Sequence, residues 1–119
     1  MISAVIMGFS LEALSTYHSI AWAHHDPATA TGMSNREYML MVEQAIAQSD
    51  VVVFNATDDN LSIDEVVILH TAYINRTPII AVGLRALSPL LEEMVSQRFP
   101  ELDFVVEHLM ASYKLSKQS

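Results

Sequence analysis

Short apolar runs alternate with longer mixed segments along this sequence. Residues 3–8, 50–56 and 78–83 are dominated by Val, Ile and Ala, and polar residues or glycines bound each run. Continuous apolar runs of this length predict strands that are buried on both faces. Residues 36–48 carry apolar positions at helical spacing and predict an amphipathic helix. Residues 62–75 predict a second helix.

The beginning and the end of the chain are less regular. Residues 9–26 combine a short helical pattern with the run SIAWAHH, which is compatible with another strand. Residues 87–97 predict a helix, the run LDFVV at 102–106 predicts a short strand, and residues 106–113 predict a last helix. We expect residues 114–119 to be a frayed, solvated tail.

The order of these elements predicts the fold class. Strands that alternate with helices indicate parallel pairing and right-handed crossovers. We therefore predict an α/β three-layer sandwich around a parallel sheet, formed by residues 1–119 as a single domain. Such sheets bind ligands beyond the carboxyl ends of their strands, near the point where the strand order reverses. The segments to inspect are residues 8–10, 55–65 and 83–88.

Composition narrows the partners. The chain is 51% hydrophobic, enough for a core, and contains no cysteine, which excludes disulfides and thiolate zinc sites. Its 14 acidic and 6 basic residues give a formal charge of -8, so neither duplex nucleic acid nor an anionic membrane is an expected partner. No apolar run is long enough for a membrane span, and the first residues lack the basic region of a signal peptide. We predict a cytoplasmic protein.

The segment DDNLSIDEVVILHTAY, which begins at Asp58, has two physical interpretations. Ser62 and Glu65 fit the S-x-x-E pattern of a capping box, in which each side chain bonds the other residue's backbone amide. Asp64 and Glu65 would also complement the helix dipole, and Asp58 and Asp59 would then be solvated turn residues. In this interpretation the segment only starts a helix.

The second interpretation is catalytic. Glu65 lies just beyond the carboxyl end of the predicted central strand, and a helix N-terminus favours its charged form. An ionised, fixed carboxylate can attack a sugar carbon. Asp59 could handle the proton of the leaving group. The segment itself is compatible with both interpretations.

The residues from Ser49 to Gly83 resemble the core of the nucleoside 2-deoxyribosyltransferase superfamily, which includes 2'-deoxynucleoside 5'-phosphate N-hydrolases. The shared pattern is an acid at a helix end, an apolar strand, an acidic loop, a glutamate that opens a helix, and a proline before the next strand. The matching residues are Asp50, residues 51–53, Asp58, Asp59, Glu65, Ala72, Tyr73 and residues 78–80, with Gly8, Ser88 and Pro89 outside this core.

The resemblance implies a flavodoxin-like, Rossmann-like fold and cleavage or transfer of the N-glycosidic bond of a 2'-deoxynucleoside or its 5'-monophosphate. It implies that Glu65 is the nucleophile and that Asp59 orients and protonates the base. It also implies that no metal or organic cofactor is needed and that the chain forms a homo-oligomer, a dimer or larger. The expected substrate-binding residues are Gly8, Phe9, Asn55, Asp58 and Ser88.

Other residues have weaker functional interpretations. Adjacent histidines on a strand point in opposite directions, so His24 and His25 make a poor pair of metal ligands. Tyr17 or Tyr38 could contact a sugar or base, although an aromatic residue in such a segment more often serves packing. Two further hypotheses remain open: a non-catalytic nucleotide-binding or sensing module, and an oligomeric interaction protein. A small, apolar chain is expected to pair.

Overall fold

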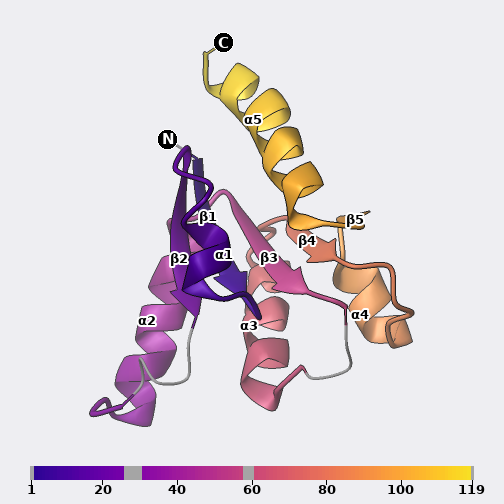
Figure 1. Ribbon diagram of the computed structural model, residues 1–119. Helices are drawn as coiled ribbons and strands as arrows, with labels where there is room; N and C mark the ends of the chain where they lie inside the picture. The colour runs from indigo at the N-terminus through magenta and orange to yellow at the C-terminus, as the bar shows by residue number, and fades with distance from the viewer. Residues whose placement is uncertain (1, 26–30, 58–60, 119) are drawn as a thin grey trace.

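A five-stranded parallel sheet forms the centre of the molecule (Figure 1). The computed structural model describes residues 2–25, 31–57 and 61–118. The strand order is β2-β1-β3-β4-β5, and every neighbouring pair is parallel. This order is that of flavodoxin-like proteins, so the predicted α/β architecture is confirmed. The strands are β1 (Ile2–Met7), β2 (Ile20–His25), β3 (Val51–Asn55), β4 (Ile79–Val82) and β5 (Gln97–Phe99).

Helices cover both faces of the sheet. One face packs against α2, α3 and α4, and the other packs against α1 and α5. Figure 1 shows α3 between α2 and α4. In the described part of the chain, no helix has both the length and the apolar character that crossing a membrane requires. The helices are α1 (Leu11–Leu14), α2 (Asn35–Ala47), α3 (Ile63–Ile74), α4 (Pro89–Met94) and α5 (Leu102–Gln118).

The run of valines in β3 serves both layers of the core. Val51 and Val53 pack on the side of α1 and α5, whereas Val52 and Phe54 pack on the side of α2, α3 and α4. All four side chains are fully buried. Successive side chains of a strand point to opposite faces, so a strand that is covered on both faces needs a continuous apolar run.

The sequence-based prediction is wrong at the edge of the sheet. Residues 102–106 were expected to form a strand, but they belong to the first turns of α5. Val105 and Leu109 are both buried there, one helical turn apart, so helical periodicity explains the apolar run. The edge strand is instead β5, and the helix predicted over residues 87–97 ends at Met94.

Candidate functional site

Strands β1 and β3 end side by side where the strand order reverses. Met7 pairs with Phe54 in the register of the two strands. The chain after β1 continues into α1 on one face, and the chain after β3 continues into α3 on the other. The two loops therefore diverge at this point, which is where ligands of such folds bind.

Gly8 and Asn55 fasten the two loops to each other. The Asn55 side-chain Nδ2 donates to the Gly8 carbonyl oxygen at 2.9 Å. Gly8 has φ +82°, and a Cβ placed there would lie 2.8 Å from the Asn55 Cβ, so only glycine fits this contact. Asn55 Oδ1 accepts from the Thr57 backbone amide at 2.9 Å. The two residues lie together and their polar atoms bond to the loop framework; neither lines the pocket described below, and their predicted roles in substrate binding stay predictions.

Phe9 lies on the opposite face from α3. Its partly buried side chain packs against the core beneath α1 and α5. Its carbonyl oxygen is 2.6 Å from Nε2 of His24, which ties the end of β2 to the loop after β1. The structure therefore uses Phe9 and His24 to hold the sheet's carboxyl edge.

Glu65 takes part in a complete capping box at the start of α3. Its backbone amide donates to Ser62 Oγ at 3.1 Å, and its Oε1 accepts from the Ser62 backbone amide at 3.3 Å. The Glu65 side chain is partly buried. The capping interpretation of this segment is thus confirmed. It leaves the catalytic interpretation open, because the capping bond uses only one carboxylate oxygen.

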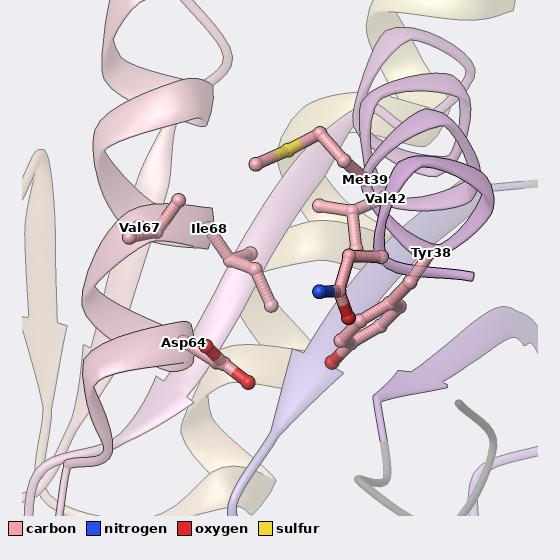
Figure 2. A pocket seen from close by; sticks show the side chains of 7 residues that line it. Tyr38, Met39, Val42, Asp64, Val67 and Ile68 are labelled. Atoms are coloured by element: carbon pink, nitrogen blue, oxygen red, sulfur yellow. The ribbon is translucent and has the colours of Figure 1, made fainter. Parts of the chain in front are cut away.

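A pocket of about 320 Å³ lies between α2 and α3; Asp64 lines it, and Glu65 does not. Figure 2 shows Asp64 reaching from α3 toward Tyr38 on α2, with Ile68 between the two helices. The volume is at the lower end of the range for small-molecule sites. The pocket has an apolar wall and a polar end, and its lining residues are Asn35, Tyr38, Met39, Val42, Asp64, Val67 and Ile68.

Tyr38 lies at the polar end of the pocket and contacts His25 in two ways. Its hydroxyl lies 3.0 Å from Nε2 of His25, and the two rings are parallel within 6° at a centroid distance of 5.8 Å. Burial raises the pKa of Tyr38, and the negative charges of Asp64 and Glu65 raise it further. The phenol therefore keeps its proton at neutral pH and can donate a hydrogen bond.

The pocket is electrostatically negative. Asp64 lines it, Glu65 follows in the same helical turn, and the lining residues include no lysine or arginine. An uncharged or cationic ligand suits such a site better than a phosphate.

Three other predicted residues lie away from the pocket or outside the described residues. Ser88 is the N-cap of α4, beyond the end of β4, and it is not among the residues that line the pocket. In that region Arg98 bonds the carbonyls of Gly83 and Arg85 and forms an ion pair with Glu92 at 3.1 Å. Asp58 and Asp59 lie outside the described residues, so their predicted roles stay predictions.

Sequence reasoning missed the α2 side of this pocket. The sequence suggests Tyr38 as a ligand contact, but it does not suggest Asn35 or Met39, and for Asp64 it indicates only an interaction with the helix dipole. The pattern that could have suggested them is the second S-x-x-E box, Ser34 to Glu37, which places the start of α2 at the same edge of the sheet as α3.

Among the described residues, no group of three or more His, Asp or Glu side chains could hold a metal ion.

Comparisons with known proteins support the fold. No protein-family model and no curated protein matches this sequence. A 3-dehydroquinate dehydratase-like protein from Bifidobacterium longum has a similar structure, with a TM-score of 0.54, 14% identity, and coverage of 96% of this chain and 95% of that one. The pseudo-receiver domain of the CikA protein is similar with a TM-score of 0.56, 13% identity, and coverage of 93% and 96%.

At such low identity these two similarities show the fold alone. They do not confirm the resemblance to nucleoside 2-deoxyribosyltransferases. What they establish is that the chain has a flavodoxin-like α/β fold.

Proposed function

We propose that the chain binds an uncharged 2'-deoxynucleoside in the pocket between α2 and α3 and cleaves or transfers its N-glycosidic bond. The observation that carries this proposal is the position of Glu65, which opens α3 at the carboxyl edge of the sheet, next to the pocket-lining Asp64. The resemblance to the deoxyribosyltransferases supports the choice of a deoxyribosyl group.

The proposed chemistry uses Glu65 as the nucleophile. A carboxylate oxygen forms a bond to C1' as the C1'–N bond breaks, and the bonding electron pair leaves with the base, which takes up a proton. Water or a second base then displaces the carboxylate from C1'. Oε1 stays bonded to the Ser62 amide, which holds the carboxylate in place. By resemblance the proton comes from Asp59.

The pocket supplies recognition. The protonated phenol of Tyr38 and the amide of Asn35 can bond polar atoms of a base or sugar, while Met39, Val42 and Ile68 offer an apolar surface for a ring. Because Asp64 and Glu65 oppose a phosphate, we propose the nucleoside as substrate in preference to its 5'-monophosphate.

Base release measured by liquid chromatography tests this proposal. Deoxynucleosides and their monophosphates are incubated with the parent chain, with and without a second nucleobase. Glu65→Gln keeps a capping acceptor but removes the nucleophile, so we expect release to fall by about 1000-fold or more. Glu37→Gln is the matched control, because Glu37 makes the same capping contacts on α2 but is exposed, whereas Glu65 is partly buried.

Equal release by Glu65→Gln and the parent would refute the nucleophile. Faster release from monophosphates than from nucleosides would refute the substrate class. Exchange in the wells with a second base would identify a transferase, and free deoxyribose alone would identify a hydrolase.

The second candidate function is a non-catalytic binding or sensing module. The observation that favours it is the complete Ser62–Glu65 capping box, which explains Glu65 without chemistry. Its test is calorimetric titration with the same nucleosides: binding that Tyr38→Phe weakens about tenfold, with no base release, would support a sensor.

A further inference from the structure

A groove of about 710 Å³ lies at the amino edge of the sheet, where α3 and α4 end. Its lining residues come from the segments 73–78 and 93–96, which lead into β4 and β5. Glu65 is at the other end of α3, and a helix of 12 residues is about 18 Å long. The groove is therefore separate from the pocket between α2 and α3. Its volume is within the range of small-molecule sites.

Arg76, which lines this groove, has a strained backbone. Its φ is +60°, and among the described residues it is the only non-glycine with a positive φ. The Arg76 amide donates to the Tyr73 carbonyl, and the Thr77 amide donates to the Ala72 carbonyl. These two bonds form the Schellman ending of a helix, whose left-handed position is usually a glycine. A basic residue in the last turn of α3 would complement the helix dipole without this strain, so the dipole alone does not explain Arg76.

Two opposite charges line the groove without neutralising each other. Arg76 and Glu93 are both exposed there. Neither side chain forms an ion pair or a hydrogen bond with any other residue that the structure describes. The hydroxyl of Thr77, between the two helix ends, likewise has no bonded partner in the described part of the chain. A ligand can therefore bond these three groups without displacing an existing contact.

The rest of the groove is mainly apolar. Tyr73 and Ile74 have 46% and 65% of their surface accessible, so they present a ring and an aliphatic side chain to a ligand. Met94 on the α4 side is half-buried, and its thioether suits contact with an aromatic ring. The apolar lining residues are Tyr73, Ile74, Pro78, Met94 and Val95.

We propose that this groove binds a free α-amino acid with an apolar side chain. The Arg76 guanidinium binds the ligand's carboxylate, the Glu93 carboxylate binds its ammonium group, and the apolar residues contact its side chain. A simple anion would be opposed by Glu93 and a simple cation by Arg76, whereas a zwitterion is attracted by both. The site does not depend on the reaction proposed for Glu65, so either proposal can fail without the other.

An NMR titration of the ¹⁵N-labelled chain with L-phenylalanine tests the site. We expect saturable shifts of the amides in segments 73–77 and 93–97, with a dissociation constant of about 1 mM or below. N-acetyl-phenylalanine lacks the ammonium group and phenylalanine amide lacks the carboxylate, so each should bind at least tenfold more weakly. An absence of saturable shifts up to about 10 mM, or shifts confined to other segments, overturns the proposal. Equal binding of the two blocked compounds and L-phenylalanine also overturns it.

Substitutions at the two charged residues test their roles. Arg76→Gln and Glu93→Gln should each raise the dissociation constant of L-phenylalanine at least tenfold. Arg36→Gln is the matched control, because it removes the same charge from an exposed position on α2. Glycine suits a positive φ, so Arg76→Gly should keep the fold, which its melting temperature checks, and should also lose the ligand. Binding that Arg76→Gln and Arg76→Gly leave unchanged, or that Arg36→Gln weakens equally, overturns the assignment.

Discussion

Helices α2 and α3 begin with the same capping box in two different surroundings. Ser34 and Glu37 exchange side-chain and backbone bonds at 3.1 and 3.4 Å, and Ser62 and Glu65 do so at 3.1 and 3.3 Å. Glu37 is exposed, whereas Glu65 is partly buried beside the pocket-lining Asp64. The same local motif is therefore a helix start in one place and a candidate nucleophile in the other.

The difference lies in what surrounds the motif. The loop that leads to α3 leaves β3 through Asn55, which is fastened to Gly8 at the end of β1. The loop that leads to α2 passes through Gly32, which has open space where a side chain would project. A carboxylate can act in catalysis when rigid structure holds it near a binding pocket. A capping box alone provides neither the rigid support nor the pocket.

Glycine substitutions should give the largest difference in stability between the loop before α2 and the loops that Gly8 and Asn55 join. Gly8 and Gly32 both have positive φ, at +82° and +86°. In Gly8→Ala the new Cβ also meets the Asn55 Cβ at 2.8 Å, so we expect a loss of about 3 kcal/mol or more in the free energy of unfolding. Gly32→Ala adds only the backbone strain, about 1 kcal/mol. Urea denaturation measures both, and equal losses would show that the loop before α3 is not held rigidly.

Removing the N-cap side chain should destabilise the protein by the same amount at α2 and at α3. Ser34→Ala and Ser62→Ala each remove a side-chain acceptor from the N3 amide, so each should destabilise the protein by about 1 kcal/mol. Denaturation midpoints at a constant m-value check this. If Ser62→Ala also abolishes base release while the protein stays folded, the capping bond contributes to chemistry and the two helix starts differ more than their geometry shows.

The smallest expected effect is on the titration of Tyr38. Its pKa lies above the usual value of about 10 through burial first and then through Asp64 and Glu65. The folded state thus holds this proton more tightly than the unfolded chain. The associated stability is complete below pH about 10 and is lost as the pH rises through the folded-state pKa.

Ultraviolet absorbance of the phenolate, compared with Tyr38→Phe, follows this ionisation. Asp64→Asn should move the Tyr38 pKa back toward its usual value. Asp103→Asn should instead act on Tyr17, whose pKa is raised mainly by its hydrogen bond to Asp103. If Asp64→Asn leaves the Tyr38 titration unchanged, the carboxylate is not close enough to define the polar end of the pocket.

Local patterns predicted the parts of this fold that local interactions decide. Residues 51–53 indicated a buried central strand, and the S-x-x-E pattern at Ser62 correctly predicted a reciprocal cap. The prediction failed where tertiary packing determines whether an apolar run forms a helix or a strand. The run at 102–106 contains consecutive apolar residues, yet burial of Val105 and Leu109 against the sheet makes it helical.

The other failures have the same kind of cause. Strand β5 is short and lies at the sheet edge, and its Gln97 is exposed. The sequence therefore contains no apolar run that would predict this strand. The pocket depends on Tyr38 from one helix and Asp64 from the next, residues far apart in sequence that no local pattern relates. A single sequence can suggest that a carboxylate is functional. The residues on the opposite side of the pocket are brought there by the topology of the fold.

The reciprocal bond between Ser62 and Glu65 also affects how this protein would evolve. A glutamate that caps a helix is maintained by selection for stability alone, whether or not it ever attacks a substrate. Its persistence in descendants of this chain would therefore be weak evidence of activity. Tyr38 and Asn35 line the pocket and do not cap α3. Substitutions at these two positions would therefore accumulate in descendants that no longer bind a ligand.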